Sequence, residues 1–207
     1  MSAFTEVSFT PRTVGVYTEL SRQLKLQAPS INDVITRDHG RLVGRMLDLK
    51  ALYGSGSSGD PTGIANVSGI GTFTAASTTL TTLLAGQTAL GNGLTGSAGY
   101  ATTLAVAGTL RGRQEFASTA VTLWQNSLLA GSLAGLPARS SVALTANDII
   151  LGSWEFLNIP IWGALEISVN PFAQSNFQKG VIGVRTFLTF DVGLTYPAAF
   201  SLGSSFT

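Results

Sequence analysis

The sequence predicts an α+β protein whose strands are gathered late in the chain. Three observations predict this class: a long amphipathic helix pattern near the start, an uncharged stretch from Pro61 through Leu110, and short runs rich in β-branched and aromatic residues after Gly135. The chain has 207 residues. That length suffices for one domain or two closely packed subdomains with a real core.

Charged residues are unusually few. They make up 11% of the chain, against about a quarter in ordinary globular domains, while hydrophobic residues make up 44%. A lone monomer needs a charged surface, so such a chain is either embedded in lipid or covered by partners. Ser, Thr, Gly or Asn interrupts every apolar run, including Leu80 to Leu94, so we expect no membrane span and infer coverage by partners.

The remaining composition excludes several classes of protein. Twelve basic and eleven acidic residues give a net charge of +1, which argues against tight phosphate binding over the whole surface. The absence of cysteine excludes disulfides, cysteine-ligated zinc and iron–sulfur sites. Met1 to Thr10 contains Glu6 and has neither a basic start nor an apolar run, so it is not a secretory signal and we expect a protein made and kept in a cytoplasm.

The first elements are predicted to be extended and then helical. From Phe4 to Tyr17, β-branched and aromatic residues alternate with polar ones, which favours strands interrupted at Pro11. Thr18 to Gln27 has helical spacing and ends at the turn Ala28 to Ser30.

The strongest helix signal runs from Ile31 to Tyr53. Ser30 and Asp33 resemble a capping box with Asp in place of Glu, and Gly54 suits the helix end. A helix of this length measures roughly 35 Å at about 1.5 Å per residue. The predicted apolar stripe is Ile31, Val34, Ile35, Leu42, Met46, Leu49 and Tyr53, and the opposite polar face is Arg37, Asp38, Arg41, Arg45, Asp48 and Lys50.

The uncharged stretch and the region after it predict helices, then strands. Ser77 to Leu90 favours a helix, Gly91 to Gly99 a glycine-rich loop, and Leu104 to Leu123 mixes helical and strand patterns. The late strands are predicted at Leu136 to Val142, Ile149 to Phe156, Leu165 to Val169, Gly180 to Asp191 and Val192 to Tyr196.

One motif matches the letters of a dinucleotide-binding loop. Gly54 to Gly59 has the GxGxxG pattern, but it follows a helix rather than a strand, and no acidic residue between Pro61 and Leu110 could hold a ribose. Lys50 precedes the loop, so there is no phosphate-loop lysine after it. The pattern therefore indicates a flexible loop that ends a helix.

The titratable side chains do not form a catalytic pattern. His39 is the one histidine, and with no cysteine it favours a solvent-facing or interfacial polar contact over a metal ligand. The acids are dispersed: neither Asp33 with Asp38 nor Glu155 with Glu166 places two carboxylates side by side on one element.

Serines and aromatic residues also favour structural roles. No GxSxG elbow precedes a later histidine, so a serine hydrolase is disfavoured. Aromatic side chains without neighbouring Lys or Arg favour core packing or subunit contact over base stacking. They are Trp124, Trp154, Trp162, Phe172, Phe177, Phe187 and Phe190.

Two stretches resemble the Hong Kong 97-type major capsid family of tailed phages. The first is Val16 to Val67: Val16 to Leu24 is similar to the strand and turn before that family's spine helix, and Ile31 to Tyr53 to the helix itself. Ala51 to Gly56 followed by Asp60 to Asn66 is similar to the family's "AL.G.G…P.GI.N" segment, its most specific match.

The second stretch is C-terminal. The family's "G.LAG.P…S" strand is similar to Leu123-Trp124, Gly131, Leu133 to Ala138 and Ser140. The family's "R…D..V..P.AF" ending is similar to Val184-Arg185 followed by Asp191 to Phe200. Asp148 to Trp154, Gly163 and Leu165 to Val169 lie between these matches.

The resemblance implies a capsid fold of two domains. A peripheral domain would hold the spine helix and strands, and an axial domain a mixed sheet with helices. We expect residues 1–66 to be peripheral with a loop remnant, residues 67–165 axial, and residues 166–207 strands returning to the peripheral domain. The family's N-terminal arm and most of its extended loop have no counterpart here. Lys25, Lys50 and Lys179 are the only lysines, and none lies where a cross-linking loop lysine would.

The function implied is structural, with no catalytic, cofactor-binding or metal-binding residue and no cofactor. The chain would form an icosahedral phage or prophage shell around double-stranded DNA, through pentamers and hexamers of itself, in the virion after assembly in the bacterial cytoplasm. Other capsid, portal or scaffolding proteins and weak, non-specific DNA contact are further expected partners, with no membrane. The alternatives are an encapsulin-like nanocompartment shell and, more distantly, a hydrolase using Glu155, Glu166 and Asp191.

Overall fold

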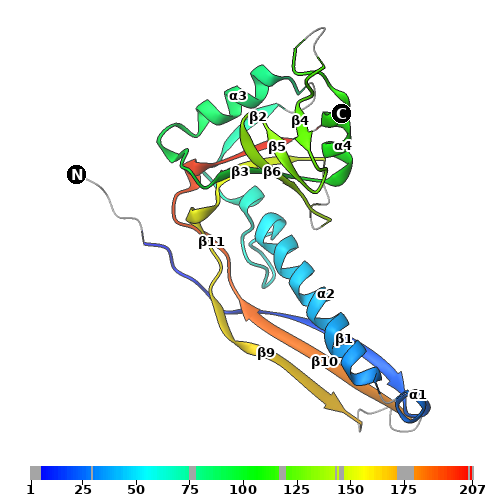
Figure 1. Cartoon of the computed structure of the whole chain (residues 1–207). Helices are drawn as coiled ribbons and strands as arrows, with labels where there is room; N and C mark the ends of the chain where they lie inside the picture. Colours follow the sequence, from blue (N-terminus) through cyan, green and yellow to red (C-terminus); the bar gives the residue numbers. More distant parts are fainter. Residues whose placement is uncertain are drawn as a thin grey trace.

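The two larger of three sheets divide the described residues into a long shaft and a lobe (Figure 1), and the third sheet is a two-stranded pair. The computed structural model describes residues 6–28, 30–74, 78–116, 120–142, 144, 147–171, 180–204 and 206. The shaft consists of a three-stranded sheet and two helices, and the lobe of a seven-stranded sheet and two helices. The α+β class predicted from the sequence is confirmed.

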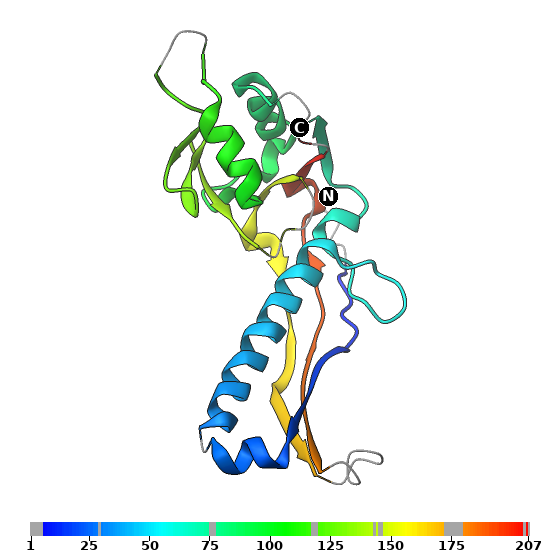
Figure 2. The ribbon, with the colours of Figure 1, turned by 90° about the vertical axis from the view of Figure 1, so that its right-hand side faces the viewer.

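The shaft sheet is antiparallel and has the order β1-β10-β9. Its strands are β1 (Arg12–Ser21), β10 (Val181–Phe190) and β9 (Ile161–Asn170). Helix α1 (Arg22–Gln27) ends the shaft, and helix α2 (Ile31–Tyr53) returns along one face of the sheet toward the lobe (Figure 2). The helix contacts β1 and β10. Among the described residues, one helix therefore covers one face of the shaft sheet, and no second layer covers the opposite face.

His39 joins α2 to this sheet. The side chain is 1% exposed, and its two ring nitrogens lie 2.8 Å from the hydroxyls of Thr186 on β10 and Thr18 on β1. A neutral imidazole has one donor and one acceptor, and a hydroxyl can match either. The expectation of a solvent-facing or interfacial histidine is thus wrong, because two threonines 21 and 147 residues away satisfy the ring inside the shaft.

The buried face of α2 also differs from the predicted stripe. His39, Val43, Ala51 and Leu52 are buried, whereas two stripe residues are exposed, Val34 by 54% and Leu42 by 39%. The helix faces the narrow β1-β10 surface, so only side chains within a thin sector can be covered. The Ser30 side chain makes no capping hydrogen bond, so the predicted capping box is not formed.

The lobe sheet has the order β2-β12-β7-β3-β6-β5-β4. Helix α3 (Leu80–Ala89) begins at a capping box between Thr79 and Thr82, and α4 (Leu104–Gly112) begins at a Thr103 cap. Leu83, Leu110 and Trp124 lie in the core that these helices share with the sheet. The strands are β2 (Gly71–Thr74), β3 (Ala98–Thr102), β4 (Trp124–Asn126), β5 (Ala130–Leu133), β6 (Leu136–Ser140), β7 (Ile149–Ser153) and β12 (Phe200–Ser204).

Both sheets place aromatic rings over glycines of the neighbouring strand. The ring of Phe200 occupies the space where a Cβ of its paired residue Gly152 would lie, and the ring of Phe73 does the same at Gly203. In the shaft, Phe187 covers its partner Gly15 in this way. This pairing gives a strand glycine the packing that it lacks. It shows how strands of a chain with 24 glycines still pack in the two larger sheets.

Several predicted elements have different limits. The strand predicted to end at Tyr17 runs to Ser21 and starts directly after Pro11, since proline cannot donate to the ladder. The predicted loop at Gly91 to Gly99 already contains the start of β3, and Leu104 to Leu123 begins as α4. The last predicted strand, Val192 to Tyr196, is shorter in the structure. Only Gly193–Leu194 (β11) are in a strand, which pairs with β8 (Leu157–Asn158). Strands β2, β4, β5, β8 and β12 were not predicted.

The strands do not divide at the expected domain limits, 1–66, 67–165 and 166–207. Strand β9 starts at Ile161, before the expected limit after residue 165, and pairs in the shaft sheet. Phe200 to Ser204 form β12, which hydrogen-bonds between β2 and β7 in the lobe. The physical reason is burial: the Phe200 ring is fully buried in an apolar cluster with Ile150 and Ile64.

Replacing Gly152 with Ala should destabilise the lobe by about 1 to 3 kcal/mol, because the new Cβ would overlap the buried Phe200 ring. Urea unfolding monitored by circular dichroism measures this change. The matched control is Gly108→Ala on the exposed face of α4, where a Cβ meets no atom and should stabilise by up to about 1 kcal/mol. Equal effects of the two substitutions would contradict this packing.

Replacing His39 with Leu should destabilise the shaft by about 2 to 4 kcal/mol, because it leaves the Thr18 and Thr186 hydroxyls without their partner. Adding Thr186→Val should recover part of that loss, since the second orphaned group is removed. Arg37→Leu, an exposed change on the same helix, should stay within about 0.5 kcal/mol. A His39→Leu protein as stable as the wild type would refute the bridging role.

Candidate functional site

The end of α2 and the loop after it join the shaft to the lobe; we call residues 50–66 the neck. Gly54 ends the helix, and Gly56, Ser58 and Gly59 have positive φ angles of 71°, 53° and 86°. The loop closes when the Gly63 N–H donates to the Gly54 carbonyl, and the short 3-10 helix Ile64–Asn66 follows. The GxGxxG letters therefore lie in a loop that follows a helix, as predicted, and this loop is closed by hydrogen bonds.

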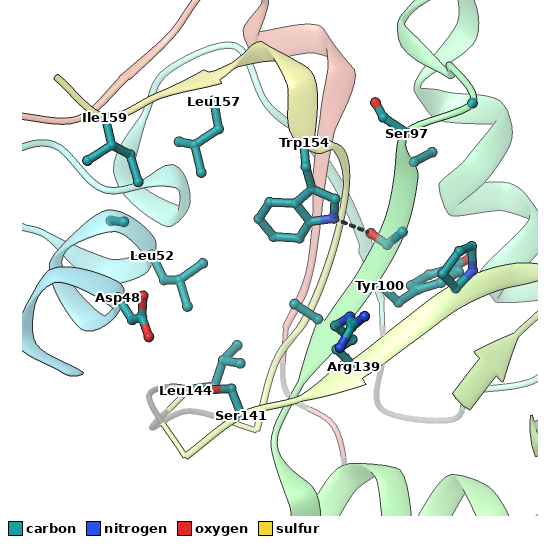
Figure 3. A pocket seen from close by; sticks show the side chains of 16 residues that line it. Asp48, Leu52, Ser97, Tyr100, Arg139, Ser141, Leu144, Trp154, Leu157 and Ile159 are labelled. Carbon is teal, nitrogen blue, oxygen red and sulfur yellow. Dashed lines mark hydrogen bonds between the residues drawn. The ribbon is translucent and has the colours of Figure 1, made fainter. Parts of the chain in front are cut away.

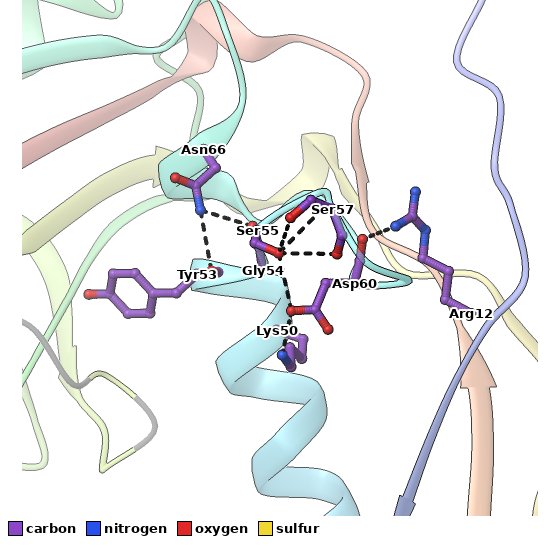
Figure 4. Close-up of polar contacts among 8 residues, drawn as sticks. All are labelled: Arg12, Lys50, Tyr53, Gly54, Ser55, Ser57, Asp60 and Asn66. Carbon is purple, nitrogen blue, oxygen red and sulfur yellow. Dashed lines mark hydrogen bonds and ion pairs between the residues drawn. The ribbon is translucent and has the colours of Figure 1, made fainter.

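Side chains hold this loop against α2 (Figure 4). Lys50 Nζ donates to Asp60 Oδ2 at 2.6 Å, and Ser55 Oγ donates to the same oxygen at 3.3 Å. Asn66 Nδ2 donates to the Gly54 carbonyl at 2.9 Å. The last turn of the helix, the loop and the first residues that lead into the lobe are thus tied together.

A second set of contacts ties the neck to the shaft sheet. Arg12, the first residue of β1, donates from Nη1 to the Asp60 carbonyl, and its Nε lies 3.7 Å from Asp191 Oδ1. The Thr10 N–H donates to Asp191 Oδ2 at 2.7 Å. Asp191 directly follows β10 and is 6% exposed. The start of β1 and the end of β10 therefore meet at the neck.

The electrostatics of the neck follow from these contacts. The hydrogen bond from Lys50 holds the pKa of Asp60 below its ordinary value. Burial raises the pKa of the Tyr53 hydroxyl, and the nearby Asp148 carboxylate raises it further. Tyr53 ends α2 and Asp148 precedes lobe strand β7. The raised pKa of Tyr53 therefore arises where shaft and lobe meet.

An apolar cluster underlies the polar contacts. Leu52 of α2 and Ile64 after the loop pack with Ile150, Leu194 and Phe200 from the lobe and its connections. These residues are all at most 9% exposed. The neck is therefore a continuous core between shaft and lobe.

Beside this core lies a cavity of about 580 Å³ (Figure 3). Small residues of β3, among them Ala98, Gly99 and Ala101, form part of its lining. Its apolar walls come from α2 and from the connection between β7 and β9, through Leu52, Ala51, Trp154, Leu157 and Ile159. Trp154 is fixed there by donating from Nε1 to the Gly99 carbonyl at 3.2 Å.

Two charged side chains also line the cavity. Asp48 comes from α2 and Arg139 from β6. Partial burial raises the pKa of the Asp48 carboxyl. The cavity is thus apolar, with one acid and one base among its lining.

The structure does not bring the proposed hydrolase acids into one site. Asp191 pairs with Arg12 beside the neck, Glu166 accepts from Ser168 on shaft strand β9, and Glu155 lies in the 3-10 helix Trp154–Phe156. Across the described part of the chain, no three His, Cys, Asp or Glu side chains are grouped closely enough to hold a metal ion. None of the helices in the described ranges is both long and apolar enough to cross a membrane.

The aromatic residues have divided roles. Trp124 and Phe190 are fully buried and Trp154 lines the cavity, whereas Trp162 is 40% exposed on β9. Phe172 and Phe177 lie outside the described residues. The sequence did not predict the contacts of Arg12 or the Lys50–Asp60 pair, because their partners lie in different elements.

The Phage capsid family matches residues 1–205, almost the whole chain. The chain belongs to the phage capsid family. A curated relative of this capsid-family chain, the major capsid protein of Halomonas phage phiHAP-1, is 26% identical over 209 residues, which is 96% of the chain. The match covers 33% of that relative, so the chain spans about a third of its length.

Solved structures show the same fold. The capsid of an empty GTA particle computed with C5 symmetry superposes with a TM-score of 0.76 at 14% identity, over 99% of this chain and 79% of that chain. A structure from Mycobacterium phage Ogopogo gives a TM-score of 0.70 at 16% identity, over 94% and 75%. The expected Hong Kong 97-type fold is therefore confirmed for this capsid-family chain.

Replacing Asp60 with Asn should lower stability near neutral pH by at most about 1 kcal/mol, the upper range for an exposed pair. Because folding lowers the Asp60 pKa, its contribution is present above the ordinary value of 3.8 and disappears as the pH falls through the folded-state pKa. Urea unfolding of both proteins between pH 7 and pH 2 should show the two curves converging in acid. A difference that persists or grows in acid would refute the Lys50 contact.

Proposed function

We propose that this chain is a structural, non-enzymatic subunit of a phage or prophage capsid shell. Copies would associate as pentamers and hexamers in the virion, around double-stranded DNA. Family membership supports this proposal. The observation that carries it is the uncovered edge strand of the shaft.

Strand β9 is the edge of the shaft sheet, and most of it is exposed. Over ten residues it contains a single charge, Glu166. Edge strands of proteins that remain monomeric are normally short, charged or covered, because an open edge pairs with other chains. The exposed apolar side chains on β9 are Ile161, Trp162, Leu165, Ile167 and Val169, with exposed fractions of 38% to 55%.

The rest of the shaft also exposes large apolar side chains. Tyr17 is 55% exposed on β1, and Leu26 at the end of α1 is 75% exposed. A single helix layer cannot cover a three-stranded sheet on both faces. These surfaces support a subunit whose apolar groups become contacts in an assembly.

We assign the shaft to the peripheral domain and the lobe to the axial domain. The assignment keeps the expected division, with β9 moved to the peripheral part and β12 to the axial part. Interaction with DNA would be weak and non-specific, because a near-neutral chain offers few phosphate contacts. Portal, scaffolding or other capsid proteins are compatible partners.

The purified chain should self-associate in a concentration-dependent way, giving rings, sheets, tubes or shells. Analytical ultracentrifugation and negative-stain electron microscopy measure this. Ile167→Lys should weaken association by placing a charge on the β9 surface while leaving the fold intact, since the side chain is already 38% exposed. Ile167→Val is the matched control. A wild-type chain that stays monomeric at all concentrations and salts would overturn the proposal.

A further inference from the structure

We infer that the cavity beside the neck, between α2 and β3, receives apolar side chains from a second copy of this chain. The inference rests on the proposed self-association and names one surface that would carry it. The cavity lies where α2, β3, β6 and the β7–β9 connection meet. An occupant there would contact shaft and lobe at once and fix their relative placement.

The dimensions and lining of the cavity fit such an occupant. Its volume of about 580 Å³ lies in the range of sites that bind groups larger than one side chain. Gly96 lines the cavity and is exposed, and a Cβ added to it would meet no atom within 4 Å. The cavity is therefore open at Gly96 to a group from outside.

Charge complementarity favours a protein segment. The side chains of Asp48 and Arg139 both line the cavity and are exposed, and within the described residues neither side chain is hydrogen-bonded or ion-paired. An apolar group that carries an acid or a base beside it would fill the cavity and pair with one of these charges. An occupant of opposite charge would pair with a charge that is now exposed to solvent, and such complementary charges favour a specific partner.

This chain offers that chemistry at three exposed places. They are Lys25 between Leu24 and Leu26, Glu115 before Phe116, and Glu166 between Leu165 and Ile167, with apolar exposures of 38% to 75%. The first place, on α1, lies at the far end of the shaft from the lobe (Figure 1). Its leucines are too far from the cavity of their own chain to enter it, so this segment could fill the cavity only in a second copy.

The chain has no cysteine, so one introduced thiol can be labelled without ambiguity. Gly96→Cys is coupled to benzophenone-maleimide, allowed to assemble and irradiated, and cross-linked peptides are read by mass spectrometry. The control is Gly108→Cys, exposed on α4 outside the cavity. We expect covalent dimers from Gly96→Cys that map to one of the three segments. Dimers no more abundant than in the control would overturn the inference.

Blocking variants give an independent readout. Gly96→Leu should fill the mouth of the cavity and lower the association constant by about tenfold or more, equivalent to about 1.4 kcal/mol, with no loss of thermal stability in the free subunit. Gly108→Leu should assemble like the wild type. Normal assembly of Gly96→Leu, or a small molecule found in the cavity by native mass spectrometry, overturns the inference but not the proposed function. A wild-type chain that never associates would overturn both.

Discussion

The burial of the last turns of α2 is the interaction on which the other parts depend. At about 1.5 Å per residue its 23 residues span roughly 35 Å, so one rigid helix enters both the shaft and the lobe. His39 and Val43 anchor it to the shaft sheet, and Leu52 anchors it in the neck cluster. The Lys50–Asp60 and Arg12–Asp191 pairs then close around the point where the chain leaves the helix.

Aromatic rings beside strand glycines let this glycine-rich, charge-poor chain form packed sheets. Rings of Phe73, Phe187 and Phe200 fill the space beside strand glycines, so the sheets are packed without large side chains on every strand. The shaft is thin, because it consists of a three-stranded sheet with one long helix on it. Because one helix covers only β1 and β10, the apolar side chains of β9 stay exposed. A subunit built this way gains stability when other copies cover it.

The neck combines polar and apolar roles. Its hydrogen bonds fix the direction in which the chain enters the lobe, while its apolar cluster makes shaft and lobe continuous. The adjacent cavity is the place where this continuity is incomplete, since α2 and β3 are separated by unfilled space. A contact from outside the chain would therefore act on the relative placement of the two parts more directly than a contact on either part alone.

The sequence by itself determined the α+β class, the long helix from Ile31 to Tyr53, the loop at Gly54 and the family resemblance, because these depend on local periodicity, turn residues and contiguous motifs. Only the tertiary structure decided the rest. His39 is buried because Thr18 and Thr186 come from distant strands, and β12 joins the lobe because Phe200 packs over Gly152. The cavity likewise depends on four elements that are adjacent only after folding. Partners separated by many residues leave no local pattern, so these contacts could not be read from the chain alone.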